Sequence, residues 1–325
     1  MPQCGVLSYR AQVAQLRRIA MSALDAYELS DPKVQFVAHG ENTTFKVTVR
    51  AERFLLRVHR PNRHGRFVDS SAAITSELRW LTALRNETDL AVPEPVPTRD
   101  GAFTTTESER ICSVLRWMDG RRHSESPRPR HLRLLGEAMA RLHNHADAWE
   151  PPKEFVRIRW DWETFFGDTM EYGGINAAQV WDLLPRDLRK DFEHVADTAR
   201  EAMARLDDVG LIHADLHLDN ALFAGGGVKL IDFDDSGTGH RLYDLAVALW
   251  ELRHREDYEQ FRAALLDGYT AHRPLPADNV DTFIAVREVA FGLWFVGTAR
   301  VNPAFRDRLD RELAGIRRRL AALRR

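Results

Sequence analysis

The spacing of hydrophobic positions changes along the first part of the chain. Apolar residues recur at helical spacing over about residues 13–24 and predict an opening helix that ends near Pro32. Three strand-like runs follow, at residues 34–38, 44–49 and 54–59. A helix is predicted from about Ser70 to Arg85, with two further strands, one around Val96 and one over residues 111–117. The chain is therefore expected to begin with a β-rich unit.

The pattern becomes mainly helical beyond Trp117. Asp119-Gly120 is typical of a turn, and residues 121–131 are rich in Arg, Ser and Pro, so we place a boundary between one lobe over residues 1–118 and another over 119–325. One exception is an apolar stretch over residues 222–231 that three glycines interrupt, which predicts a hairpin. Apolar residues spaced by four and three over 309–323 predict a closing amphipathic helix.

Composition narrows the class of protein. The chain of 325 residues has 44% hydrophobic and 29% charged residues and a net charge of −2, which argues against a nucleic-acid binder that relies on a broad positive field. Its two cysteines exclude a disulfide framework and a cysteine-based zinc site. No secretory signal follows Met1, and no apolar stretch approaches the roughly 20 residues that span a bilayer. We expect a cytoplasmic protein without a nucleic-acid or membrane partner.

Two short motifs carry the candidate chemistry. Asp215 and Asn220 lie in one segment, and Asp232 follows twelve residues after Asn220. Phosphoryl transfer from a nucleotide needs a carboxylate that accepts the proton of an attacking hydroxyl, together with amide and carboxylate oxygens that hold magnesium. The predicted hairpin places Asn220 and Asp232 at its two ends. Alternatively, these side chains only cap a turn and end a strand, positions that Asp and Asn favour.

The segment His213-Ala-Asp-Leu-His-Leu-Asp-Asn220 resembles the catalytic loop of the protein-kinase-like small-molecule phosphotransferases, the superfamily of aminoglycoside phosphotransferases, choline kinases and homoserine kinases. Ala214 replaces the usual glycine, and Ile231-Asp-Phe-Asp234 resembles the metal-binding segment. The resemblance runs in order through most of the chain. It implies a bilobal α+β fold, with a small β-rich N-lobe and a larger, mainly helical C-lobe. It also implies that Asp215 is the catalytic base and that Asn220 and Asp232 are Mg²⁺ ligands.

The resemblance extends to the expected nucleotide contacts. Arg57 occupies the position of the lysine that contacts the nucleotide phosphates, and Glu77 is its expected helix partner. A guanidinium keeps its charge and grips phosphate or carboxylate through two bonds, so the role survives the change. Residues 39–44 correspond to the loop over the phosphates, and residues 115–118 to the linker beside adenine. The candidate contacts in these two segments are Gly40, Asn42, Thr43, Arg116, Trp117 and Met118.

The inferred reaction is in-line transfer of the ATP γ-phosphoryl group to a hydroxyl of a small molecule. The acceptor pocket is expected from residues 157–174 and the segments after Asp232, which resemble the homoserine kinase and bacterial stress-response kinase branch. Asp234 and Asp235 are candidates for binding a cationic amine, and Trp160 either stacks on a ring or fills the core. The alternatives are a stress-response Ser/Thr protein kinase, an antibiotic-modifying phosphotransferase and a nucleotide-binding pseudokinase.

Overall fold

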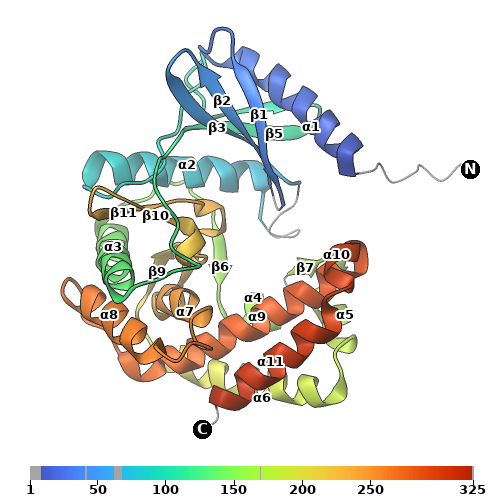
Figure 1. Ribbon diagram of the computed structural model, residues 1–325, viewed down its shortest axis with the longest axis vertical. Helices are drawn as coiled ribbons and strands as arrows, with labels where there is room; N and C mark the ends of the chain where they lie inside the picture. Colours follow the sequence, from blue (N-terminus) through green and yellow to red (C-terminus); the bar gives the residue numbers. More distant parts are fainter. Residues whose placement is uncertain (1–8, 41, 62–67, 169, 324–325) are drawn as a thin grey trace, which may run out of the picture.

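The computed structural model describes residues 9–40, 42–61, 68–168 and 170–323. Figure 1 shows a lobe that carries a sheet above a larger helical lobe, as the sequence predicts. The upper lobe begins with α1 (Tyr9–Ala23) and the short 3-10 helix η1 (Leu24–Ala26). Its antiparallel sheet has the order β1-β2-β3-β5-β4. The strands are β1 (Lys33–His39), β2 (Thr43–Val49), β3 (Glu52–Val58), β4 (Thr104–Glu107) and β5 (Arg110–Arg116).

The sheet has its own hydrophobic core. Along β2, fully buried residues alternate with half-buried ones, and the buried set includes Phe45 and Val47. Leu56 of β3 and Val114 of β5 join them, and α1 packs across this face through residues such as Ala20. The alternation is that expected of a strand with one covered face. The strands predicted at 34–38, 44–49 and 54–59 are thereby confirmed.

The strand expected around Val96 does not form. Its N–H donates to the Val114 carbonyl over 2.9 Å, and the segment makes only an isolated bridge between Pro95 and Leu115. Prolines at positions 93, 95 and 97 remove every second backbone donor, so a full ladder cannot form. The outer partner of β5 is instead β4, whose run of three threonines suits an edge strand.

Helix α2 (Ser70–Glu87) lies beneath the sheet in Figure 1 and joins it to the helical lobe. Asp69 caps its first turn by accepting from the Ala72 N–H at 2.7 Å. Leu78 and Leu81 are fully buried and belong to the core of the helical lobe rather than to that of the sheet. The helix therefore holds a fixed position between the lobes.

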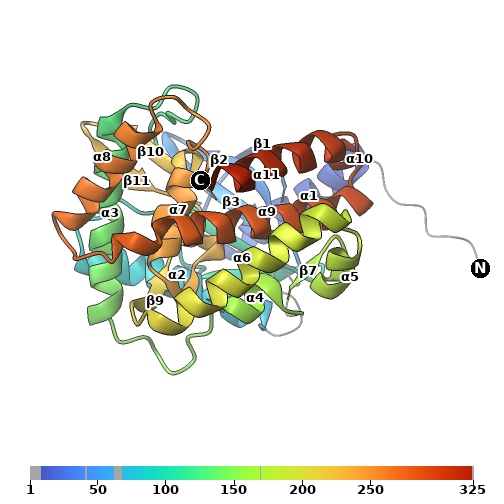
Figure 2. The ribbon, with the colours of Figure 1, turned by 90° about the horizontal axis from the view of Figure 1, so that it is seen from below.

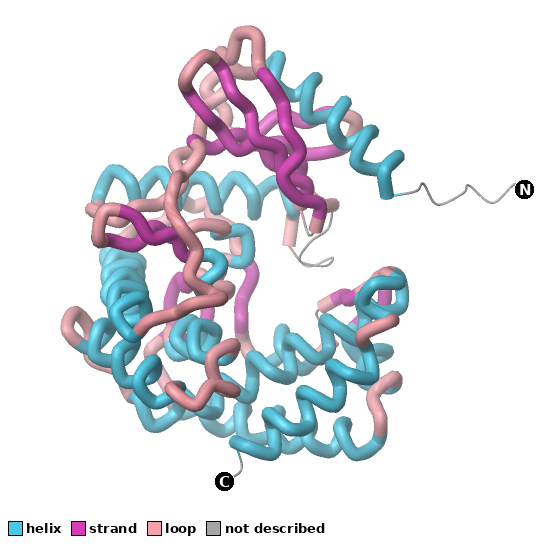
Figure 3. Tube along the Cα trace, in the orientation of Figure 1, coloured by secondary structure: helices cyan, strands magenta, loops and turns pink. Residues whose placement is uncertain are grey.

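The helical lobe contains most of the remaining helices, which Figure 3 separates by colour from the strands. The helices are α3 (Pro129–Ala148), α4 (Trp162–Phe166), α5 (Ala177–Asp182), α6 (Arg186–Arg205), α7 (Leu242–Trp250), α8 (Tyr258–Thr270), α9 (Val280–Val301), α10 (Pro303–Arg306) and α11 (Leu309–Leu323). Three short 3-10 helices are η3 (Leu218–Asn220), η4 (Phe233–Asp235) and η5 (Ala277–Asn279). The closing helix predicted at 309–323 is confirmed as α11.

Short strands in this lobe hold the loops of the site. The predicted hairpin forms from β10 (Ala221–Ala224) and β11 (Gly227–Leu230), and Gly225 and Gly226 supply the positive φ of its turn. A three-stranded sheet that was not predicted combines β6 (Ile158–Trp160), β12 (Gly237–His240) and β9 (Val209–Ile212). The remaining pair is β7 (Glu171–Tyr172) and β8 (Ile175–Asn176).

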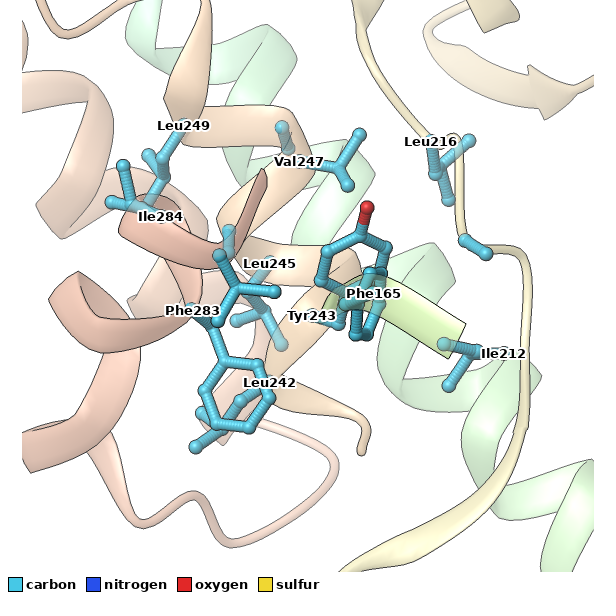
Figure 4. Packing of buried hydrophobic residues seen from close by; sticks show 14 of the residues in the cluster. Phe165, Ile212, Leu216, Leu242, Tyr243, Leu245, Val247, Leu249, Phe283 and Ile284 are labelled. Carbon is cyan, nitrogen blue, oxygen red and sulfur yellow. The ribbon is translucent and has the colours of Figure 1, made fainter. Parts of the chain in front are cut away.

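Helix α9 forms the centre of the helical lobe. In Figure 2 it runs beside α6 and α11, and it packs against both of them and against α7. Figure 4 shows Leu242 and Leu249 of α7 near Phe283 and Ile284 of α9. Helix α9, with 22 residues, is long and apolar enough to cross a bilayer, which corrects the expectation that no apolar stretch approaches this length. However, 67% of its most apolar window is buried inside the protein. Its apolar character is explained by its place in the core.

Candidate active site

Two cavities meet at Asp215. The first, here called the inter-lobe cavity, has a volume of about 600 Å³ and lies between the sheet, the linker after β5 and the β10-β11 hairpin. The second, here called the aromatic cavity, has a volume of about 570 Å³ and lies between α7, α9 and the β7-β8 turn. Side chains of Trp160, Trp250 and Phe291 line the second cavity. Because Asp215 lines both, groups bound in the two cavities can meet at its carboxylate.

The loop that carries Asp215 is clamped by Asp244 of α7. The two carboxylate oxygens of Asp244 accept the backbone N–H groups of His213 (2.9 Å) and Ala214 (2.6 Å). Ala214 is buried and has a φ of 66°, in the left-handed region that costs a non-glycine residue roughly 1–2 kcal/mol. The replacement of the usual glycine is thus accommodated, and the clamp holds the strained residue in place.

A buried pair of side chains supports Asp244 from behind. The Nε2 atom of His143 lies 3.0 Å from Asp244, and its Nδ1 atom lies 2.9 Å from the Tyr269 hydroxyl. Burial lowers the pKa of His143, and this outweighs the opposite effect of Asp244. A neutral imidazole satisfies both contacts, because Nε2–H donates to the carboxylate and Nδ1 accepts from the hydroxyl.

Asn220 and Asp232 lie at the two ends of the hairpin, as predicted, and both line the inter-lobe cavity. The Asn220 amide nitrogen donates to the carbonyl (2.9 Å) and the carboxylate (3.1 Å) of Asp215, which turns the amide oxygen away from Asp215. The Asp232 side chain is 49% exposed. Among the described residues, no group of three or more His, Cys, Asp or Glu could hold a metal alone. One amide and one carboxylate suit Mg²⁺, which takes its other ligands from water and phosphate.

The predicted ion pair between Arg57 and Glu77 is present. The two side chains are 3% and 1% exposed, and Nη1 of Arg57 lies 2.8 Å from Oε1 of Glu77. Burial lowers the pKa of Arg57, but the charges of Glu77, Asp232 and Asp234 outweigh it and raise the pKa above its ordinary value. The second nitrogen of the guanidinium lies 3.6 Å from Asp232. A permanent positive charge therefore stands beside the expected metal ligand.

Some residues at and before the start of β2 line the inter-lobe cavity, and others are buried in the sheet. Gly40 and Asn42 line the inter-lobe cavity, as does Thr44. Thr43, a predicted phosphate contact, is instead buried and lies outside the lining, with its hydroxyl 2.6 Å from Nδ1 of His39. The reason is the alternation of β2, since adjacent residues face opposite sides of a strand. Thr44 takes the position expected of Thr43.

The linker residues Arg116, Trp117 and Met118 also line the inter-lobe cavity. The Arg116 side chain points to the surface, where it pairs with Glu52 (2.8 Å) and Glu94 (3.2 Å). The backbone N–H of Trp117 donates to the backbone carbonyl of Arg53, so Trp117 takes part in the hydrogen bonding of the sheet. The backbone N–H of Trp117 is therefore not available to a group bound in the cavity.

The three residues predicted for the acceptor separate in the structure. Asp234 lines the inter-lobe cavity and accepts from the Asn42 side-chain amide at 2.6 Å, so it does not line the aromatic cavity. Asp235 and Trp160 do line that cavity, and the indole N–H of Trp160 donates to the Asp235 carbonyl at 2.7 Å. The separation follows from η4, where successive residues project in different directions.

Sequence reasoning missed Arg287 of α9. Its Nη2 atom lies 2.6 Å from Oδ1 of Asp215, and its guanidinium lies 5.3 Å from the centre of the Trp250 ring. Burial alone would raise the pKa of Asp215, but the charge of Arg287 and a hydrogen bond with His217 hold that pKa well below its usual range. Burial lowers the pKa of His217, but its contacts with Asp215 and Glu251 outweigh this and raise the pKa to about 10.

Arg157 also has a role that its sequence did not indicate. The segment that begins with it was expected to build the acceptor pocket, but its guanidinium is buried and donates to four carbonyl oxygens. These belong to Ser236 (2.5 Å), Ala73 (2.8 Å), Phe233 (3.2 Å) and Asp234 (2.7 Å). Arg157 therefore ties the segment around Asp232 to α2.

Comparison with known proteins identifies the family of this chain. The profile of the phosphotransferase enzyme family matches residues 33–277. A homoserine kinase of Rhodospirillum rubrum is 33% identical over 192 residues, which cover 58% of this chain and 57% of the relative. The chain thus matches less than two thirds of that relative's length.

Solved structures extend the likeness to nearly the full length of the chain. The structure of a microcompartment-associated aminopropanol kinase has a TM-score of 0.76 and 28% identity, and the match covers 94% of this chain and 98% of that one. An amicoumacin kinase in complex with AMP-PNP has a TM-score of 0.73 at 19% identity, with 95% and 93% of the two chains covered, which shows the same fold. The predicted α+β kinase-like fold is confirmed. The chain belongs to the phosphotransferase enzyme family and is a kinase of small molecules that phosphorylates a hydroxyl group.

Proposed function

We propose that this protein transfers the γ-phosphoryl group of ATP, with Mg²⁺, to a hydroxyl of a small molecule that carries a charged group. The observation that carries the proposal is the position of Asp215 at the junction of the inter-lobe and aromatic cavities. A nucleotide in the first and an alcohol in the second would bring the phosphorus and the attacking oxygen together at one carboxylate.

Asp215 and the residues that line the inter-lobe cavity each have a role in the proposed reaction. Asp215 orients the acceptor hydroxyl and takes its proton as the new bond from oxygen to phosphorus forms and the bond to ADP breaks. Arg57, held by Glu77, binds the phosphates. Asn220 and Asp232 would hold Mg²⁺, which neutralises charge on the phosphates. The backbone at Met118 and the apolar wall of Leu55 would receive the base.

The small-molecule acceptor is supported by the form of the aromatic cavity. Its volume of about 570 Å³ lies within the range of ligand pockets, and Trp160, Trp250 and Trp294 line it together with carboxylates such as Asp235. Aromatic walls with a few charged groups suit a compact polar molecule. The names of the similar proteins, homoserine kinase and aminopropanol kinase, point to acceptors of that size.

The test uses labelled ATP, Mg²⁺ and a panel of amino alcohols, hydroxy amino acids, sugars, aminoglycosides and a generic protein. Label is expected on a small acceptor, and Asp215→Asn is expected to lower kcat by about 10³-fold without loss of nucleotide binding. Asp267→Asn, on the exposed face of α8, is the matched control. Transfer that survives in Asp215→Asn would overturn the assignment of the base. Bound nucleotide without transfer to any acceptor would identify a pseudokinase.

A further inference from the structure

A buried carboxylate behind the aromatic cavity joins the cavity wall to α11. The Glu288 side chain of α9 is fully buried, and its Oε2 atom accepts from the indole N–H of Trp250 at 2.7 Å and from Nη2 of Arg253 at 2.8 Å. Arg319 of α11, which runs beside α9 in Figure 2, donates through Nε to Oε1 at 3.0 Å and to Oε2 at 2.9 Å. A buried carboxylate needs charged partners of this kind, and the loss of one is costly. Glu288 therefore connects the end of α7 with α11.

The place of the Arg319 side chain is set within α11 itself. Its Nη2 atom lies 2.9 Å from Oε1 of Glu312, an acidic residue in the first turn of the helix. Gly315 lies between the two, and a Cβ atom there would be 2.9 Å from Nη1 of Arg319. Glycine is unfavourable in the middle of a helix, so its presence fits the close approach of the guanidinium. Helix α11 thus brings a positive charge to Glu288 in one defined position.

Trp250 carries the effect of Glu288 to the groups of the site. Its ring lines the aromatic cavity and lies 5.3 Å from the guanidinium of Arg287, which pairs with Asp215 at 2.6 Å. An indole has a single polar hydrogen, so its bond to Glu288 fixes which way the ring faces. Phe291, another lining residue, packs against the same ring. None of the described residues of α11 lines either cavity, so α11 acts on this wall from outside.

We propose that Glu288 and Arg319 are positioning residues, which hold Trp250 in the orientation that the acceptor needs. This inference rests on the proposed function, because that function assigns the aromatic cavity to the acceptor. With Arg319 in place, the Glu288 carboxylate is held from two sides, by α11 and by Arg253. Without Arg319 the carboxylate is held from one side, and the indole bonded to it loses its fixed place. Binding of the acceptor depends on this pair, whereas binding of the nucleotide does not, because neither residue lines the inter-lobe cavity.

The first test measures the KM of each substrate in Arg319→Gln. Labelled ATP and Mg²⁺ are used with L-homoserine, 1-amino-2-propanol and any other alcohol of the panel that receives label. The KM of the acceptor is expected to rise about fivefold, the effect of roughly one lost hydrogen bond, while the KM of ATP stays unchanged. Arg319→Lys, which keeps the charge, should recover most of the wild-type KM. Arg318→Gln, at an exposed neighbouring position of α11, is the matched control.

A purely structural role gives a different kinetic result. Loss of folded protein would lower kcat and leave both KM values unchanged, and this outcome in Arg319→Gln overturns the proposal. Trp250→Phe keeps a ring without the N–H, so it should raise the acceptor KM by a similar factor. In that variant, adding Arg319→Gln should lower the urea midpoint but cause no further rise in the acceptor KM. A further rise in the double variant would mean that Arg319 does not act through Trp250.

The position of the indole can also be followed without any substrate. In an NMR spectrum of isotope-labelled protein, the indole N–H signal of Trp250 is identified by its loss in Trp250→Phe. Arg319→Gln is expected to shift this signal, because the hydrogen-bond acceptor of the indole moves, whereas Arg318→Gln should leave it in place. An unshifted signal in Arg319→Gln overturns the proposal.

The NMR measurement separates this proposal from the proposed function. If no alcohol receives label from the wild-type protein, the proposed function fails, and the indole signal still decides whether α11 positions Trp250. Should Arg319→Gln fail to fold, Glu312→Gln takes its place, because it removes the second partner of Arg319. Its expected shift and rise in acceptor KM are smaller but have the same direction, and the absence of both overturns the proposal.

Discussion

The inter-lobe and aromatic cavities have similar volumes, about 600 and 570 Å³, but the chain builds them in different ways. The first is lined by several short motifs between residues 37 and 234, such as the hairpin between Asn220 and Asp232, and these motifs can be recognised in the sequence. The second draws its walls from residues far apart in sequence, and Arg287 lies 72 positions from Asp215. The comparison indicates that the proposed catalytic and metal-binding residues lie in short sequence motifs, whereas long-range packing assembles the walls of the proposed acceptor cavity.

The largest effect that would sharpen this comparison is expected at Arg57. Arg57→Leu leaves Glu77 buried without its partner, which should lower the free energy of unfolding by about 3–5 kcal/mol and kcat/KM for ATP by at least about 10²-fold. Arg57→Lys should retain most of both. The KM of the acceptor should change little, because Arg57 lines the other cavity. Steady-state kinetics with each substrate varied in turn measures this.

A double substitution is the control for the stability part of that effect. Arg57→Leu combined with Glu77→Leu removes both buried charges, so it should recover most of the free energy of unfolding but none of the nucleotide affinity. Urea unfolding and ATP titration report the two quantities separately. Recovered affinity in the double variant would contradict a phosphate-binding role for Arg57.

A smaller effect is expected at Trp250, where the KM of the acceptor should change and the KM of ATP should not. Trp250→Leu removes the ring under Arg287 and should raise the acceptor KM roughly tenfold, while the KM of ATP remains unchanged. Trp149→Leu, at the C-terminal cap of α3 and outside the lining of both cavities, controls for loss of an indole elsewhere. Equal changes in both KM values would mean that the two cavities are not separable units.

The smallest effect concerns the network that supports the loop shared by both cavities. The pKa of His143 is lower in the folded protein than its ordinary 6.5, so the unfolded chain binds the proton first as pH falls. The contribution of the neutral His143 to the free energy of unfolding is fully present above about pH 6.5. It is lost below that pH, by at most about 1.4 kcal/mol per pH unit. Urea unfolding between pH 7 and 5 gives the free energy of unfolding at each pH. Plotted against pH, this free energy should have a shallower slope in His143→Gln than in the wild-type protein.

His272→Gln, which changes an exposed histidine, should keep the wild-type slope in the same measurement. An unchanged slope in His143→Gln would show that Asp244 does not depend on a neutral imidazole for its place behind the catalytic loop.

Much of the site was predictable because its residues are close in sequence or lie on regular elements. Arg57 and Glu77 face each other as the family resemblance implied, and the glycine-interrupted hairpin brings Asn220 near Asp232. The periodicities predicted a β-rich beginning and a mainly helical remainder, and the family resemblance implied the bilobal fold. These features depend on local geometry, which a sequence expresses directly.

The remainder depends on register and on long-range packing. Thr43 and Thr44 exchange roles because a shift of one residue along β2 reverses the face, and a turn sequence alone does not fix that register. Asp234 and Asp235 separate for the same kind of reason in η4. Arg287 was unpredictable in a different sense, since it lies within an apolar helix and meets Asp215 only because α9 packs beside α7.

The four hydrogen bonds from Arg157 to carbonyl oxygens fix two parts of the site relative to the same helix. Through them the segment around Asp232 is fastened to Ala73 in the first turn of α2, and the same helix carries Glu77, which holds Arg57. Arg57, the proposed phosphate ligand, and Asp232, the proposed metal ligand, are thus both held in place by α2. If the sheet tilts as substrates enter and leave, this spacing need not be rebuilt in each turnover.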